Sequence, residues 1–280
     1  MSEPRKKLPT WLQGFRSKIK HQESPETSSE RAISIIAVHG LGGSWRTTWS
    51  AGRDEDPAIW LCDRLPESLA RLNVHPRIRA FGYDSSFVFT SSVSDLEGCA
   101  EDLLTRIRII RQTKEEKQAP IIFIAHSLGG LIVKQAINIA HTDSEYHQDV
   151  LDSTTGCLFL AVPFHGADAA SWAQLGSQIV SALSLGMAGN PGLPSVLKRN
   201  SKDWMRISKD FVHRGKNMTF RSAYETEKMG RNTIVDEASV RNNVPNERVF
   251  PVCKFGDHEN ERFGPIGLAL TEIIQTSLDG

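Results

Sequence analysis

The chain has 280 residues, of which 39% are apolar and 24% charged, with 33 basic and 33 acidic side chains. This length fits one large α/β domain or two small ones. A formal net charge of zero argues against general nucleic-acid binding. No apolar run approaches the roughly 20 residues that a membrane-spanning helix needs. We therefore expect a protein that is soluble or peripheral to a membrane.

The four cysteines are widely separated, at Cys62, Cys99, Cys157 and Cys253. They form no CxxC pair and no zinc-like cluster, so the sequence predicts no metal site. Scattered cysteines and the lack of a secretory apolar region favour an intracellular, cytoplasmic location, with association with an organelle or a membrane surface as an alternative. A disulfide between two of the four cysteines is an alternative that the sequence does not exclude.

Residues 1–30 differ in character from the rest of the chain. The segment Ser17–Glu30 is polar and lacks an apolar period, which is typical of a linker. Before it, Trp11, Phe15 and Ile19 fall on one helical face among basic residues. We expect a basic, disordered tail; the alternative is an organelle presequence or an anchor that makes peripheral contact with a membrane.

From Arg31 onward, strands and helices alternate. Residues 32–38, 120–125 and 157–162 are short, almost continuous apolar runs, as expected for parallel strands that are buried on both faces. Further strand candidates are residues 77–83, 219–225 and 248–254.

Four helices are predicted between these strands and after the last of them. The first spans residues 94–113, with Ser94 and Glu97 as a capping box. The second follows Ser127, and the third begins near Asp168. The last spans residues 265–277, with Pro265 at its first position.

This alternation predicts a doubly wound, mostly parallel α/β sheet over residues 31–280, with a small helical insertion at residues 185–215. The insertion has apolar side chains that would suit a lid over an acyl pocket or packing onto the sheet. These side chains are Leu193, Leu197, Trp204, Met205 and Phe211.

The most informative segment reads Ala-His-Ser-Leu-Gly over residues 125–129. An apolar strand ends at Ala125 and a helix begins almost at once, with Ser127 between them; this context is typical of a nucleophile elbow. Ala125 stands where the usual motif has glycine. The positive end of the helix dipole would favour negative charge at the serine. Ser127 as a simple helix cap is the alternative, but capping does not explain the two glycines that follow or His126.

A serine nucleophile needs a base and an acid from elsewhere in the chain. His258 is the candidate base, because it follows the last strand candidate and the order in α/β hydrolases is Ser, acid, His. Glu225, at a strand end, is the preferred acid, and Asp236 is the alternative. Asp257 is a weaker option, because adjacent side chains usually diverge.

A glycine-rich segment follows the first strand, at residues 39–43. Such a turn can present a backbone N–H to the serine, and we place this donor at Leu41, with Gly40 as its neighbour. Together with the N–H of Leu128 it would form an oxyanion hole. A phosphate-binding loop fits poorly, because Trp45 occupies the position of the third glycine.

The strings VHGLGG and AHSLGG and the late pair DH, in this order, resemble those of α/β-hydrolase-fold serine esterases. More narrowly, the chain from about Ala32 onward is similar to the lipase-like group of serine-active-site-containing phospholipid-remodelling proteins, and to the hydrolase domains of fungal NLR-type receptors. In that group a Tyr-Glu-Thr string often closes the penultimate strand, which supports Glu225. Ala125 and Phe164 depart from the family pattern.

The resemblance implies a serine hydrolase that cleaves a carboxylic ester, of a small molecule or a lipid, through an acyl-enzyme and without a cofactor. Nothing in the sequence indicates a nucleic-acid partner. The alternative is a hydrolase-fold signalling or partner-binding module whose catalytic residues are silent, because one fold can serve many functions. A peptidase or a thioesterase with the same triad is also open.

Overall fold

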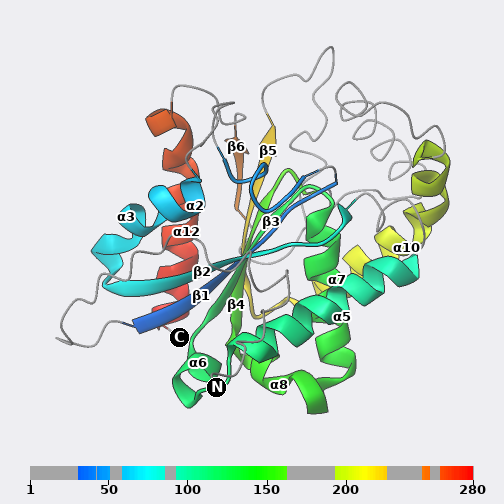
Figure 1. The fold of residues 1–280 in the computed structure, drawn as a ribbon, viewed down its shortest axis with the longest axis horizontal. Coiled ribbons are helices and arrows are strands. Elements are labelled where there is room, and N and C mark those ends of the chain that lie inside the picture. The colour runs from blue at the N-terminus through cyan, green and yellow to red at the C-terminus, as the bar shows by residue number, and fades with distance from the viewer. Residues whose placement is uncertain are drawn as a thin grey trace, which may run out of the picture. The chain divides into compact units, whose positions relative to one another are not determined.

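A six-stranded parallel sheet forms the centre of the chain (Figure 1). The computed structural model describes residues 31–41, 43–50, 59–85, 93–162, 193–225, 248–252 and 259–279. The strands are β1 (Arg31–Val38), β2 (Val74–Phe81), β3 (Ile121–His126), β4 (Thr154–Leu160), β5 (Thr219–Glu225) and β6 (Arg248–Val252). Their order is β2-β1-β3-β4-β5-β6, and every neighbouring pair is parallel.

Helices cover both faces of this sheet, so the predicted doubly wound α/β architecture is confirmed. In Figure 1, α2, α3 and α12 lie on one side and α5, α7, α8 and α10 on the other. The helical segments are α2 (Trp60–Asp63), α3 (Leu65–Leu69), the short 3₁₀ segment η1 (Ala70–Leu72), α5 (Val93–Ile110), α6 (Lys114–Gln118), α7 (Gly129–Thr142), α8 (Ser144–Ser153), α10 (Leu193–Arg214) and α12 (Glu259–Asp279).

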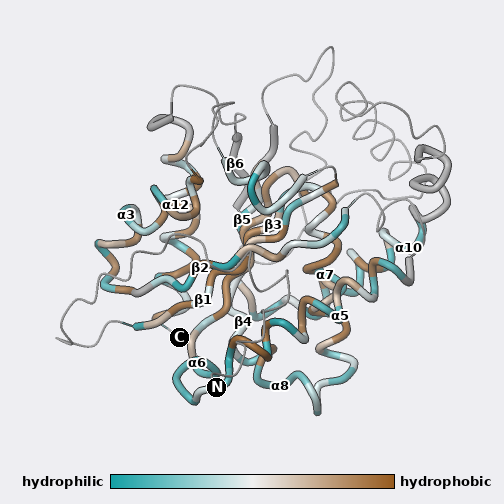
Figure 2. Tube along the Cα trace, in the orientation of Figure 1, coloured by the Kyte–Doolittle hydropathy of each residue, from teal (hydrophilic) through white to brown (hydrophobic). Residues whose placement is uncertain are grey.

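The central strands are buried on both faces, as their continuous apolar runs predicted. In β1, Ile33 and Ile35 belong to the core beneath α12, whereas Ile36 and Val38 belong to the core beneath α7. This alternation follows from the two-residue period of a strand. Figure 2 shows the same strands as the apolar centre of the fold.

The strand order reverses between β1 and β3. From β1 the chain moves outward to β2 and then returns to β3 on the other side of β1. In open α/β sheets, ligands bind beyond the carboxyl ends of the strands at such a switch point. Both glycine-containing turns singled out in the sequence leave the sheet here, after Val38 and after His126, and Val38 pairs with Ala125.

Two predicted helix starts are wrong. Helix α12 begins at Glu259, so Pro265 lies inside the helix and not at its first position. An interior proline loses one backbone hydrogen bond and crowds the preceding turn. Burial of Phe263, whose ring centroid lies 5.7 Å from that of Trp60, stabilises the turn before the proline. Helix α5 begins at Val93, so Ser94 stands within its first turn and not at the cap.

The described part of the insertion at 185–215 is helix α10, which packs against α7. Trp204 and Phe211 are fully buried and belong to the core on that face of the sheet. These two side chains therefore pack as core residues. The tail at residues 1–30, residues 185–192 and the helix expected near Asp168 lie outside the described residues. Within the described ranges, no helix is long and apolar enough to cross a membrane.

Candidate active site

Ser127 occupies a strained turn between β3 and α7. Its φ angle is 50°, in the left-handed region that non-glycine residues seldom adopt. The turn is held by two backbone hydrogen bonds: the N–H of Ser127 donates to the carbonyl of Leu160 at 2.9 Å, and its carbonyl accepts from the N–H of Gly130 at 3.1 Å. Strain of this kind, of order 1 kcal/mol or more, is typical of functional sites.

The two glycines after the turn allow α7 to pack directly against its neighbours. A Cβ on Gly129 would lie 2.1 Å from the carbonyl oxygen of His39, at the end of β1. A Cβ on Gly130 would lie 2.2 Å from a methyl of Val162, beyond the end of β4. Larger residues at either position would push the helix, and with it the serine turn, away from the sheet.

The backbone of α7 offers hydrogen-bond donors next to Ser127. Leu128 is the N-cap of α7 and is buried. The first N–H groups of a helix have no acceptor within that helix, and they lie at the positive end of its dipole. The N–H of Gly130 already donates to the Ser127 carbonyl, so on this side the predicted oxyanion donor is the N–H of Leu128.

The predicted oxyanion loop lies against Ser127. A Cβ on Gly40 would be 2.8 Å from the Cβ of Ser127 and 2.9 Å from the carbonyl oxygen of His126. Only a residue without a side chain allows this approach. Leu41, the proposed donor, is buried beside it. The structure therefore brings Gly40, Leu41, Ser127 and Leu128 together from two turns that are more than 80 residues apart in the sequence.

A tyrosine that the sequence analysis did not assign to the site completes this arrangement. The O–H of Tyr83 donates to the carbonyl of His39 at 2.6 Å, and the two rings stack with centroids 4.3 Å apart. His39 is buried, and burial lowers the pKa of its imidazole, which favours the neutral form. The only signal for this contact in the sequence is the place of Tyr83 as the last residue of the strand predicted over residues 77–83; the observed strand ends at Phe81.

The other predicted catalytic residues are placed only in part. Glu225 is the last residue of β5, where it pairs with Val252 of β6. Its backbone is therefore at the same carboxyl edge of the sheet as Ser127, two strands away. His258, the predicted base, and Asp236, the alternative acid, lie outside the described residues.

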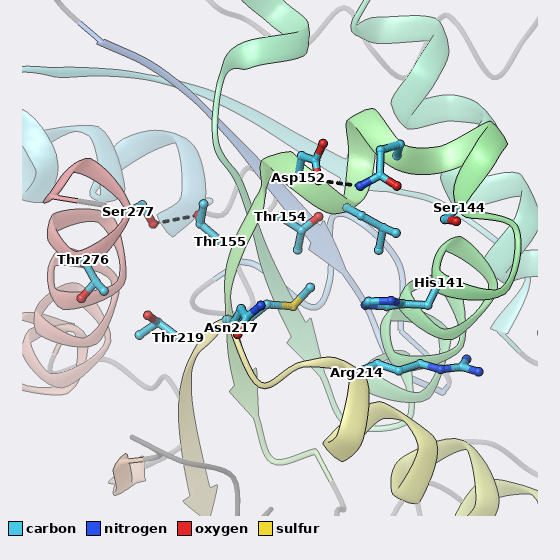
Figure 3. Close-up of a pocket in the computed structure, with 13 residues that line it drawn as sticks. His141, Ser144, Asp152, Thr154, Thr155, Arg214, Asn217, Thr219, Thr276 and Ser277 are labelled. Carbon is cyan, nitrogen blue, oxygen red and sulfur yellow. Dashed lines mark hydrogen bonds between the residues drawn. The ribbon is translucent and has the colours of Figure 1, made fainter.

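A separate cavity of about 660 Å³ lies at the opposite edge of the sheet (Figure 3). Thr154 and Thr219, the first residues of β4 and β5, contribute to its wall, with Arg214 and His141 on another side. Because Ser127 follows the carboxyl end of β3, this cavity is not part of the serine site. In the part of the chain that the structure describes, no group of three or more His, Cys, Asp or Glu side chains could hold a metal ion.

Comparisons with known proteins find relatives in sequence and in fold. Protein SERAC1 of Danio rerio is 29% identical over 152 residues, which are 47% of this chain and 22% of that protein. Human SERAC1 is 27% identical over 168 residues, or 52% of this chain and 24% of that protein. The matches thus span about a quarter of these relatives' length.

The crystal structure of Bacillus licheniformis lipase BlEst2 shares the fold, with a TM-score of 0.54 and 14% identity over 89% of this chain and 96% of that one. A family model described as "Putative serine esterase (DUF676)" matches residues 28–190. The matched segment contains Gly40 and Ser127 and ends before Glu225. Because it covers more than half of the chain, the chain belongs to this serine esterase family, DUF676.

Proposed function

We propose that the protein is a serine hydrolase that cleaves carboxylic esters, of a lipid or another acyl compound, through an acyl-enzyme on Ser127. The observation that supports this most is the contact between two turns: the glycine loop after β1 lies against the strained serine turn after β3. A serine that only capped a helix would need neither the left-handed backbone nor a side-chain-free loop beside it.

The reaction proposed has two steps. Ser127 attacks the ester carbonyl carbon while His258 accepts its proton and then returns it to the leaving alcohol. The backbone N–H groups of Leu41 and Leu128 stabilise the negative oxygen of the tetrahedral intermediate, and one such donor contributes ~3 kcal/mol to transition-state stability. Water, activated by the same histidine, then releases the acid. No cofactor takes part in this scheme.

Glu225 is proposed as the acid that orients His258, with Asp236 as the alternative. Neighbouring strands are ~4.8 Å apart, so the carboxyl end of β5 is roughly 10 Å from that of β3. An imidazole between a serine and a carboxylate spans a gap of this size. The position of Glu225 at a strand end, fixed by pairing with β6, favours it over a residue that follows the strand.

The ester substrate is proposed from the family description, which names a serine esterase. We also propose an intracellular location, with association with a membrane surface through residues 1–30 as the alternative. Cys62, Cys99 and Cys157 are free thiols, which is compatible with a reducing compartment.

Hydrolysis of p-nitrophenyl esters with acyl chains of two to sixteen carbons tests the proposal. We expect turnover with at least part of the series, and loss of that turnover in the Ser127→Ala variant. Variants Glu225→Gln and Asp236→Asn, assayed side by side, identify the acid. Only replacement of the carboxylate that belongs to the triad should lower kcat by orders of magnitude.

A well-folded wild-type protein without turnover on the whole series, and without reaction at Ser127, would contradict the proposal and favour a silent, partner-binding module. Turnover of thioesters or peptides in place of oxygen esters would keep the triad and change the substrate class.

A further inference from the structure

Two consecutive peptide groups form the loop that faces Ser127: the group between His39 and Gly40, and the group between Gly40 and Leu41. In a planar trans peptide the C=O and the N–H point in opposite directions. A contact that holds the carbonyl of one of these groups therefore fixes where its N–H points.

The first carbonyl, that of His39, is held from two sides. The O–H of Tyr83 donates to it at 2.6 Å. On another side lies the Cα of Gly129, where an added Cβ would come within 2.1 Å of the same oxygen. The Tyr83 hydroxyl therefore holds this carbonyl by a hydrogen bond, and Gly129 confines it because it packs closely against the oxygen.

The second carbonyl, that of Gly40, is held by the His39 ring. Nδ1 of His39 lies 3.1 Å from the Gly40 oxygen, and because a carbonyl can only accept, Nδ1 carries the proton. The N–H of Gly43 also donates to this oxygen, at 3.2 Å. The N–H of the same peptide group belongs to Leu41, the proposed oxyanion donor.

Tyr83 acts on both peptide groups. Its hydroxyl holds the first carbonyl directly, and its ring stacks on the His39 imidazole at an angle of 10°, which sets the direction of Nδ1 toward the second. Tyr83 reaches the loop because Phe81, two residues earlier, pairs with Val38 at the end of β1. The Tyr83 ring also stacks on that of Phe81, at 5.6 Å between centroids.

We propose that Tyr83 is a positioning residue for the oxyanion hole, which holds the Gly40 and Leu41 N–H groups in their orientation through the His39 carbonyl and the His39 ring. In this proposal it acts on the two N–H groups through His39 and not on the ester itself. The inference rests on the proposed function and adds to it a residue two positions after β2, outside both glycine turns.

The test compares Tyr83→Phe with Tyr146→Phe, an exposed tyrosine on α8. Tyr83→Phe keeps the stacked ring and removes only the donor to the His39 carbonyl. With rates normalised to active sites titrated by a fluorophosphonate, we expect kcat to fall roughly 10- to 100-fold, part of the loss caused by removing one oxyanion donor. KM should change less than about threefold, and Tyr146→Phe should match the wild type.

A second measurement distinguishes positioning of the oxyanion donors by Tyr83 from a contribution of Tyr83 to protein stability alone. A trifluoromethyl ketone forms a hemiketal whose oxyanion occupies the same hole, so its inhibition constant should rise by the same factor by which kcat/KM falls. Replacement of His39 gives the matching series: His39→Asn, which keeps an N–H donor near the Nδ1 position, should retain more activity than His39→Ala.

If Tyr83→Phe lowers only the melting temperature or the titrated fraction of active sites, with kcat per site and ketone binding unchanged, the positioning role is refuted while the esterase proposal stands. If the folded wild type shows no Ser127-dependent turnover, the proposed function and this role are both refuted.

Discussion

The most direct test of the site geometry is to add a single methyl group at Gly40. In a Gly40→Ala variant, the new Cβ would lie 2.8 Å from the Cβ of Ser127, about 0.6 Å shorter than 3.4 Å, the lower end of ordinary van der Waals contact. It would also lie 2.9 Å from the carbonyl oxygen of His126. Neither neighbour is the end of a flexible side chain, so the loop or the serine turn must shift.

A shift of this size should reduce activity strongly while the protein stays folded. Displacement of a catalytic group by about 1 Å can cost about 10²-fold in rate, and loss of one oxyanion donor costs about 10²- to 10³-fold. Overpacking by one methyl group costs roughly 1–3 kcal/mol in the free energy of unfolding. We therefore expect kcat/KM for a short ester to fall about 100-fold or more in a protein that remains folded.

Gly98→Ala is the matched control. Gly98 lies in α5 with no atom within 4 Å of an added Cβ, so this variant should keep full activity and gain about 0.5–1 kcal/mol of stability. Ester hydrolysis and urea unfolding measured on both variants give the comparison. A Gly40→Ala protein with wild-type kcat/KM would refute the close contact between the oxyanion loop and Ser127.

Three further predictions concern stability and reactivity. Ser127→Gly should be more stable than Ser127→Ala by about 1 kcal/mol in urea unfolding, because glycine adopts a φ of 50° without strain; equal stabilities would argue against the strained turn. Burial, with a smaller contribution from the charge of Asp102, raises the pKa of Cys99 to about 11, so at pH 9 its alkylation by iodoacetamide, followed by peptide mass spectrometry, should be roughly 10- to 50-fold slower than in the unfolded chain. Glu272→Gln should lower the free energy of unfolding by about 1–2 kcal/mol, since it leaves the Arg221 guanidinium, 2.7 Å away and 9% exposed, without its carboxylate.

Much of the fold was predictable because the relevant signals are local. Continuous apolar runs identified β1, β3 and β4, since strands buried on both faces need no polar alternation. The turn at Ser127 was predictable as well, because a strand, a serine and two glycines follow one another without a gap. Gly40 and Gly129 lie in the two glycine-containing turns that the sequence singled out, and in the structure neither position has room for a side chain.

The features that were missed depend on partners distant in the sequence. Tyr83 reaches His39 only because β2 pairs with β1 in a particular register, which no local pattern encodes. Helix α12 continues through Pro265 because Phe263 packs against Trp60, some 200 residues earlier in the chain. In both cases tertiary packing, and not propensity, decides the outcome.

The central claim is that Ser127 is a nucleophile, and covalent labelling tests it most directly. Wild-type protein and the Ser127→Ala variant are incubated with a fluorophosphonate, and the adduct is located by intact-mass measurement and peptide mapping. The account predicts one adduct per chain, on Ser127, and none in the variant, with both proteins folded by circular dichroism. Equal labelling of both proteins, or no labelling of a folded wild type, would contradict it.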